Sequence, residues 1–296
     1  MKSISCSAYR QTIMKRKPVI IGIGELLWDM LPSGKKAGGA PVNFAHHAYG
    51  SGAESYAISA VGNDLLGDEI MKEIEKIGIH HLVERVDYPT STVRVELKDG
   101  IPNYTIIENV AWDYMPLTEA MMELAGKADA ICFGTLAQRS VESRNTIQTM
   151  LSLVPVSAYR IFDINLRQHF FSREIIIDSL NQCNVFKINQ EEMAILKEMF
   201  DVPESEEKES CKWFVEKFDL KFMILTAGAD YSLIVTPESD SLIRTPHVKV
   251  VDTVGAGDSF TGAFISAILS GKSFKEAHRL AVDRSAFVCT QAGAWV

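Results

Sequence analysis

The stretch Asp252-Thr-Val-Gly-Ala-Gly-Asp-Ser-Phe260 tells most about the fold and the chemistry of this chain. It follows an apolar run at 248–251 that is typical of a strand, and it leads into a predicted helix over 256–269. A glycine-rich turn that enters a helix gathers N–H groups and the positive end of the helix dipole at one point, which favours a bound anion. Asp258 falls in the first helical turn, where a carboxylate could accept a proton from an attacking hydroxyl.

The residues alone leave two interpretations of this turn open. Besides an anion site, the pattern fits a helix start in which glycine allows a tight turn and Asp258 complements the helix dipole. The spacing matches neither GxxxxGK[ST] nor GxGxxG, so the usual nucleotide-binding fingerprints are absent. Near the start of the chain, Gly22-Ile-Gly24 continues with Leu27 instead of a third glycine, which argues against a redox enzyme with a nicotinamide cofactor.

Working outward, apolar runs typical of buried strands alternate with helical patterns along most of the chain. The predicted strands are 19–23, 55–60, 130–133, 159–162, 185–188 and 222–225. The predicted helices, besides 256–269, are 40–49, 68–77, 190–199 and 274–290. Such alternation implies parallel β-α-β units, so we expect one α/β domain.

A different pattern interrupts this alternation. Residues 92–97 alternate between apolar and polar with period 2, and residues 104–107 do so more loosely. Asp99-Gly100 lies between the two runs, as in the loop of a β-hairpin. We therefore expect a hairpin that projects from the main sheet.

Composition narrows the classes of function. The 296 residues carry a formal net charge of −8, which argues against a broad basic surface for nucleic acid. An acidic chain that binds an anion must do so locally, through backbone N–H groups, a metal or a few cations. No apolar run approaches the ~20 residues of a membrane span. The five cysteines include no CxxC pair, which predicts free thiols in a reducing cytoplasm.

The chain is predicted to begin with a tail. Residues 1–16 are polar and mixed, without the apolar centre of a secretory signal. They fit either a frayed end or an over-extended start before Met14. The domain itself is expected to span 17–296.

Candidate ligand residues recur at or just beyond the ends of predicted strands, where open α/β sheets bind ligands. Asp29 could accept two hydroxyl hydrogen bonds, and Asn43 offers a donor and an acceptor that suit a polyol. Singly, each is more often a turn or a cap than a ligand residue. In chain order the candidates are Asp29, Gly38, Gly39, Asn43, Asn189, Glu192, Thr226, Gly228 and Gly255 to Asp258.

In this combination and order, the segments resemble the ribokinase-like sugar kinases of the PfkB family. The resemblance extends from about residue 18 to the end, with signature segments at 38–45 and 252–260. It implies a three-layer α/β/α sandwich with a mostly parallel central sheet and a small β-sheet lid. The lid would comprise residues 90–110 and segments near 28–38.

The resemblance also implies a role for each matching residue. Asp258 would be the catalytic base, and Gly255, Ala256 and Gly257 the anion hole for the transferred phosphate. The sugar would lie against Asp29, Gly38, Gly39, Asn43, Asn165 and Arg167. ATP would contact Asn189, Thr226, Gly228 and the glycines of the anion hole, with Glu192 helping to hold Mg²⁺, partly through water.

Within the family, the segments 24–29 and 108–113 look most like those of bacterial fructokinases. This implies fructose as the acceptor, with O6 favoured over O1. Ribose, a nucleoside, 2-keto-3-deoxygluconate and a sugar sensor without turnover stay as alternatives. The preference for adenine is also open, because Tyr231 replaces a glycine of the nucleotide loop and Asp283 replaces an asparagine. Dependence on a monovalent cation such as K⁺ is a further open point, and the lid is the expected interface of a homodimer.

Overall fold

The computed structural model describes residues 16–31, 34–98, 101–203 and 206–296, and for 94–98 and 101–104 it describes the backbone alone. The predicted tail, 1–16, therefore lies outside the described residues except for Arg16. Bounds of elements below refer to these parts of the chain.

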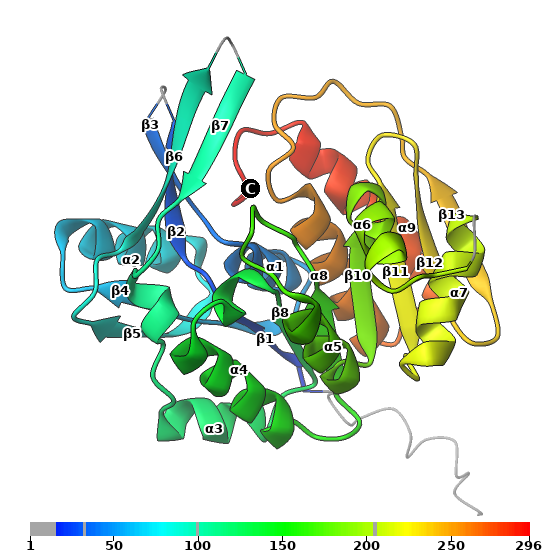
Figure 1. Cartoon of the computed structure of the whole chain (residues 1–296), viewed down its shortest axis with the longest axis horizontal. Helices are drawn as coiled ribbons and strands as arrows, with labels where there is room; N and C mark the ends of the chain where they lie inside the picture. Colours follow the sequence, from blue (N-terminus) through cyan, green and yellow to red (C-terminus); the bar gives the residue numbers. More distant parts are fainter. Residues whose placement is uncertain (1–15, 32–33, 99–100, 204–205) are drawn as a thin grey trace, which may run out of the picture.

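A nine-stranded sheet runs through the described chain in the order β13-β12-β11-β10-β9-β8-β1-β4-β5 (Figure 1). Its strands are β1 (Val19–Ile23), β4 (Glu54–Gly62), β5 (His80–Val86), β8 (Ala130–Phe133), β9 (Tyr159–Asp163), β10 (Val185–Asn189), β11 (Phe222–Ala227), β12 (Tyr231–Val235) and β13 (Asp240–Arg244). All neighbours pair in parallel except β12 and β13, which form an antiparallel edge. The predicted mostly parallel sheet is confirmed.

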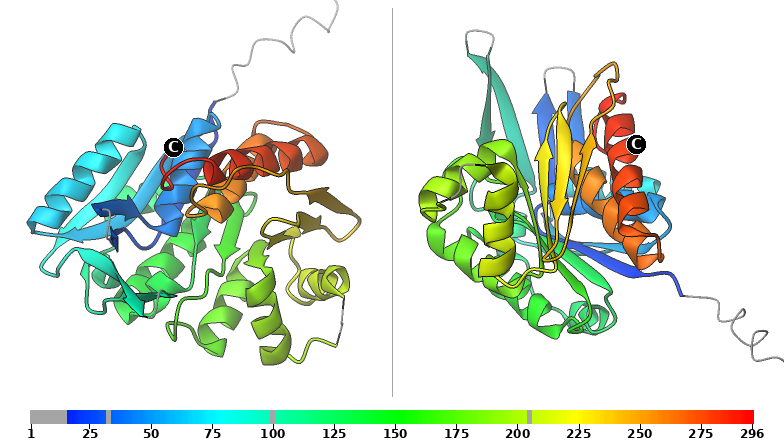
Figure 2. Two further views of the ribbon diagram at one scale, coloured as in Figure 1. Left: turned by 90° about the horizontal axis from the view of Figure 1, so that it is seen from above. Right: turned by 90° about the vertical axis from the view of Figure 1, so that its right-hand side faces the viewer.

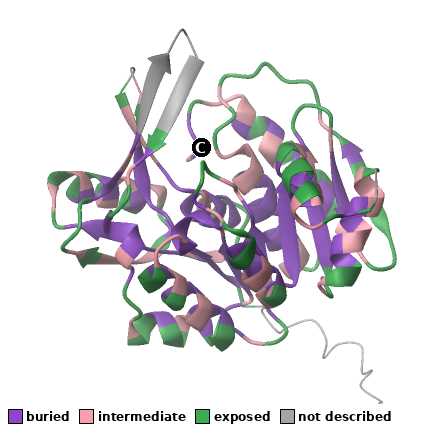
Figure 3. Ribbon diagram, viewed as in Figure 1, coloured by how far each residue is buried: buried purple, intermediate pink, exposed green. Residues whose placement is uncertain are grey.

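Helices cover both faces of this sheet, as the two views of Figure 2 show. On one face lie α1 (Ala40–Gly50), α2 (Leu65–Ile77), α8 (Ala256–Leu269) and α9 (Phe274–Cys289). On the other lie α3 (Glu119–Ala125), α4 (Val141–Leu153), α5 (Arg173–Gln182), α6 (Gln190–Met199) and α7 (Glu207–Lys217), with short 3₁₀ turns at Ala111–Tyr114 and Leu136–Gln138. Buried residues follow the strands and the inner faces of the helices (Figure 3), so the core has the three layers expected.

A second, smaller sheet stands at one edge of the sandwich (Figure 1). Its four described strands follow the order β3 (Gly34–Gly38), β2 (Leu27–Leu31), β6 (Ser91–Lys98) and β7 (Ile101–Ile106). β6 and β7 form the predicted hairpin, and β2 pairs with β6 in parallel, so the sheet is mixed. This is the small β-sheet lid.

One strand prediction is wrong. The apolar run 248–251 forms no strand, and the whole segment between β13 and α8 has no regular secondary structure. Val248, Val250 and Val251 are 36%, 58% and 59% exposed. Val248 and Val250 instead line the cleft described below, so their apolar character serves a cavity and not the core of the sheet.

The helices give no sign of a membrane segment. Within the described ranges, none is both long enough and apolar enough to cross a bilayer.

Candidate active site

A cleft of about 990 Å³ opens between the lid sheet and the carboxyl ends of the central strands. This is near the upper end of the volumes typical of ligand sites. The predicted residues that line it are Asp29, Gly39, Asn43, Asn165, Arg167, Asn189, Thr226, Gly228 and Gly255 to Asp258. Gly38 and Glu192 do not line it. Below, the "α8 end" means the part around Gly255–Asp258, and the "lid end" the part around Asp29.

The first turn of α8 brings the α8 end together. Gly255 caps the helix with a φ of 79°, in the left-handed region that favours glycine. N–H groups in the first turn of a helix have no intrahelical acceptor, so they point toward the cleft as donors. The N–H of Ala256 differs, since it donates to the Thr253 carbonyl at 3.2 Å.

Asp258 lies three residues into this turn and projects into the cleft. Its Oδ2 accepts a hydrogen bond of 2.8 Å from Nδ2 of Asn43 on α1. Burial raises the pKa of Asp258, while the charges of Lys187 and Arg167 and the Asn43 hydrogen bond oppose that rise. The result is a half-buried carboxyl with cations close enough to favour its ionised form.

Next to Asp258 lies a buried ion pair that the sequence analysis missed. Lys187 and Asp163 are register partners on β10 and β9, and Lys187 Nζ is 3.1 Å from Asp163 Oδ1. Burial would lower the pKa of Lys187, but the nearby carboxylates raise it to about 12. A Cβ on Gly257 would lie 3.0 Å from Lys187 Nζ, so the ammonium sits against the glycine turn. It adds a fixed positive charge to the α8 end.

Carboxyls and small residues form the lid end. Gly38 leaves room for Asp29, since a Cβ there would lie 3.3 Å from Asp29 Oδ2. Gly39 has a φ of 132°, and a Cβ on it would lie 2.2 Å from the Glu25 carbonyl oxygen, so only glycine fits. Burial raises the pKa of Asp29 despite the opposing charges of Arg167 and Lys36.

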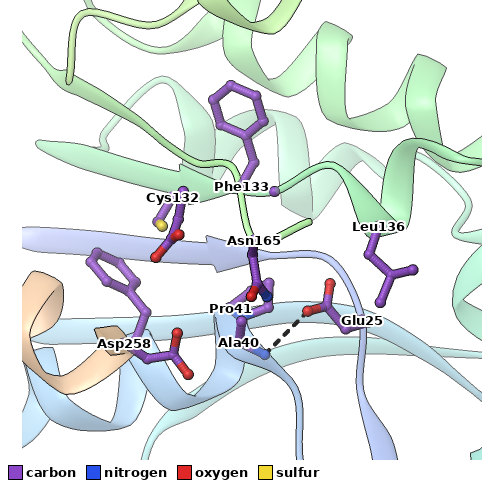
Figure 4. Close-up of a pocket in the computed structure, with 11 residues that line it drawn as sticks. Glu25, Ala40, Pro41, Cys132, Phe133, Leu136, Asn165 and Asp258 are labelled. Atoms are coloured by element: carbon purple, nitrogen blue, oxygen red, sulfur yellow. Dashed lines mark hydrogen bonds between the residues drawn. The ribbon is translucent and has the colours of Figure 1, made fainter. Parts of the chain in front are cut away.

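Glu25, just after β1, is a second functional candidate that the sequence analysis missed. It lines both the cleft and a small adjoining cavity, together with Asn165 and Asp258 (Figure 4). Its Oε1 accepts from the Ala40 N–H at 3.2 Å. Burial raises the pKa of Glu25 to about 7. The sequence places Glu25 just after the first predicted strand, which was the available signal, but the burial of the Glu25 side chain is visible only in the fold.

Comparison with known proteins identifies the family. The model described as "pfkB family carbohydrate kinase" matches residues 33–295. The chain belongs to the pfkB family of carbohydrate kinases.

Curated relatives cover nearly the whole chain at low identity. A putative sugar kinase of Pyrococcus horikoshii is 26% identical over 273 residues, which is 86% of this chain and 84% of the relative. An ATP-dependent 6-phosphofructokinase of Thermoanaerobacterium thermosaccharolyticum is 26% identical, with 95% and 91% covered. A probable fructokinase of Arabidopsis thaliana, fructokinase-5, is 27% identical, with 95% and 94% covered.

The fold agrees with solved structures of such kinases. The crystal structure of a fructokinase from Xylella fastidiosa, with bound ATP, superposes with a TM-score of 0.82 at 19% identity, covering 94% of each chain. The protein is thus an ATP-dependent sugar kinase with the ribokinase-like fold.

In this kinase, the residues predicted to hold Mg²⁺ cap a helix. The Asn189 side chain accepts from the Glu192 N–H, and Glu192 Oε2 accepts from the Asn189 N–H, each at 2.9 Å. Glu192 Oε1 accepts from the Leu166 N–H at 2.9 Å, so both carboxylate oxygens already have a donor. The described residues contain no cluster of three or more His, Cys, Asp or Glu side chains that could hold a metal. Oxygen atoms that already accept hydrogen bonds fit an ion that arrives with the nucleotide and keeps its own waters, as Mg²⁺ usually does.

Tyr231 and Asp283, the two departures from the family pattern, lie differently. Tyr231 lines the cleft beside Gly228, and its hydroxyl donates to Glu207 and accepts from Gln190 Nε2 at 3.4 Å. Asp283 is exposed and does not line the cleft. Tyr231 is therefore the departure that can affect a nucleotide.

Proposed function

We propose that this kinase transfers the γ-phosphate of ATP to a hydroxyl of fructose, O6 before O1, with Asp258 as the base. The observation that carries the proposal is the position of Asp258, half-buried in the first turn of α8 and lining the cleft between Asn43 and Lys187. A base there has a glycine turn beside it for the phosphoryl group and an open lid end for the sugar.

The reaction follows from this arrangement. The ionised Asp258 takes the proton of the sugar hydroxyl while the hydroxyl oxygen attacks the γ-phosphorus of ATP and ADP leaves. N–H groups of Gly255 and Gly257 and the Lys187 ammonium would stabilise the negative charge on the transferring group, and the Ala256 N–H would join them only by leaving the Thr253 carbonyl. Mg²⁺, when bound, would neutralise phosphate charge, and Glu192 and Asn189 would hold it through water. Thr226 and Gly228 would contact the nucleotide.

At the lid end, Asp29 and the backbone at Gly39 would bind sugar hydroxyls, and Gly38, which does not line the cleft, would serve by leaving room for the Asp29 carboxylate. Arg167 and Asn165, which both line the cleft, would lie close to the sugar and the phosphates. Closure of the lid over the sugar would exclude water, which competes as phosphoryl acceptor.

A substrate panel tests the choice of acceptor. ADP release would be followed with fructose, ribose, a nucleoside, 2-keto-3-deoxygluconate and fructose 6-phosphate, the last because one relative is named as a 6-phosphofructokinase. We expect the highest kcat/KM with fructose, and a product phosphorylated at O6 by NMR. A higher kcat/KM with another acceptor would overturn the assignment of fructose. Sugar binding with no ADP release from any acceptor would favour the sensor.

Three companion points extend the proposal. The chain would pair through its lid sheet, as the family resemblance implies. It would work in the cytoplasm, as its free thiols indicate, and K⁺ would either activate it or have no effect. Its mass in solution tests the first, since a monomer would contradict pairing. Assays with K⁺ replaced by a bulky organic cation decide the last.

A further inference from the structure

Residues 291–296, which follow α9, pack against the turn that leads into α8. The N–H of Gly293 donates to Asp252 Oδ2 at 3.0 Å. Ala294 is buried. A Cβ on Gly255 would lie only 2.6 Å from the Cβ of Ala294. The segment therefore forms a wall behind the first turn of α8.

His47 on α1 holds the same segment in place. Arg284 can only donate, and its Nε lies 3.2 Å from His47 Nδ1, so Nδ1 accepts and the ring proton is on Nε2. Nε2 then donates to the Ala294 carbonyl at 2.9 Å. Burial, with His46 and Arg284 nearby, lowers the pKa of His47 to about 3, so this neutral form persists at neutral pH.

The next residue, Trp295, contacts the site itself. Its indole Nε1 donates to Asn43 Oδ1 at 2.8 Å. An indole N–H cannot accept, so the oxygen of the Asn43 amide must face Trp295. The NH₂ group must then face Asp258, where it donates to Oδ2 at 2.8 Å. A flipped amide would oppose two donors at Trp295 and two acceptors at Asp258.

We propose that Trp295 is a positioning residue for Asp258, acting through the side-chain amide of Asn43. The inference rests on the proposed role of Asp258 as the base. With its NH₂ toward the carboxylate, Asn43 favours the ionised Asp258 that can accept a proton. Without the indole donor, the amide can turn its oxygen to the carboxyl, which favours the protonated and inactive form.

The pKa of Asp258 has other determinants, which the test must leave intact. The titratable and charged groups coupled to it are Lys187 on β10, Asp163 at the end of β9, Arg167 in the loop after β9, Glu25 after β1 and Cys132 on β8. Exchange of the Trp295 ring for a phenyl ring removes the N–H donor and changes none of these groups.

The experiment is the pH profile of kcat for Trp295→Phe in the full chain. We expect the acid limb to move up by roughly 0.5 to 1 pH unit, so that kcat at a pH on that limb falls about three- to tenfold. The KM for ATP should stay within roughly twofold. An acid limb and a kcat equal to those of the parent chain would overturn the proposal.

Three variants make the result specific. Trp213→Phe, on α7 and packed against Phe214 away from the cleft, is the matched control and should keep the parent profile. In an Asn43→Ala background, Trp295→Phe should add no further shift, because its effect passes through Asn43. Asp258→Asn separates the two claims. If it keeps full activity, the base is wrong; if it is inactive and Trp295→Phe is normal, only the role of Trp295 is wrong.

A second measurement decides the matter even if Trp295→Phe folds poorly. The chain has four tryptophans, so ¹⁵N-tryptophan labelling gives four indole signals, and Trp295 is assigned as the signal that Asn43→Ala shifts, since its N–H donates to Asn43. Its signal should shift with pH as Asp258 titrates, and this dependence should vanish in Asp258→Asn. A Trp295 signal with no such dependence would overturn the proposal.

Discussion

The α8 end and the lid end of the cleft are built in different ways. At the α8 end, the charges around the half-buried Asp258 belong to the core, since the Lys187 and Asp163 side chains are only 8% and 7% exposed. At the lid end, Asp29 lies on β2 of the small lid sheet and is half-buried, like Asp258. The glycines there leave space for it, and no ion pair fixes its carboxylate among the described contacts.

This difference separates two tasks. Charge fixed inside a packed core needs no reorganisation during reaction, which suits the phosphoryl transfer common to all substrates of such a kinase. Side chains on a lid can change without loss of the core, which suits the choice of acceptor. Changes at the α8 end should therefore affect stability and rate, and changes at the lid end the affinity for sugar.

The largest effect is expected from Lys187→Met, which tests whether a buried ion pair holds the α8 end rigid. The change leaves Asp163 buried without its partner, so we expect a loss of about 3–5 kcal/mol in the free energy of unfolding. Urea unfolding measures it. The double variant with Asp163→Asn should recover part of the loss. A single variant as stable as the parent chain would show that the α8 end is less rigid than its burial indicates.

Glu25→Gln tests the border between the two ends. Burial raises the pKa of Glu25 from 4.5 to about 7. The unfolded chain loses this proton near pH 4.5 and the folded chain near 7, so the folded state loses stability as pH rises through that window. The Gln variant escapes this loss and should be more stable than the parent chain at pH 8, by about 3 kcal/mol.

Thermal or urea unfolding from pH 5 to 8 checks this result. The difference between variant and parent should be small at pH 5 and should grow toward pH 8. A constant difference across the range would mean that Glu25 does not titrate there.

At the lid end, Asp29→Ala should act on the sugar alone. A hydrogen bond to a charged group is lost, so we expect the KM for fructose to rise about tenfold, with little change in the KM for ATP. Steady-state kinetics with each substrate varied in turn measure both constants. An equal rise for ATP would contradict the separation of the two ends.

The smallest effect is expected from Tyr231→Phe. The ring stays, and only the hydroxyl contacts to Glu207 and Gln190 are lost. The KM for ATP should change by about twofold or less, because these contacts lie within the protein. A rise in the KM for ATP of tenfold or more would assign the hydroxyl a direct part in nucleotide binding.

The sequence predicted the α8 end well because its signal is local. A glycine turn, an acidic residue and an apolar helix stand side by side in the chain, and α8 has the predicted bounds, Ala256–Leu269. The parallel strands also emerged from short apolar runs, and β1 and β8 match their predicted bounds.

What the sequence did not reveal depends on distant partners. Lys187 stands in an apolar run, and its buried ion pair can be recognised only once Asp163 is known to be its register partner on the next strand. Trp295 acts on Asn43, 252 positions away in the chain. The apolar run 248–251 misled for the opposite reason, because hydrophobicity cannot tell a strand from the wall of a cleft.

The central claim, that Asp258 is the base, is tested most directly by single-turnover transfer of γ-³²P from ATP to fructose. Enzyme in excess removes product release from the measurement, and calorimetry on the same samples checks that both substrates bind. The account predicts that Asp258→Asn binds fructose and ATP like the parent chain but transfers phosphate about 10²- to 10⁴-fold more slowly. Transfer at the parent rate by a correctly folded Asp258→Asn chain would contradict it.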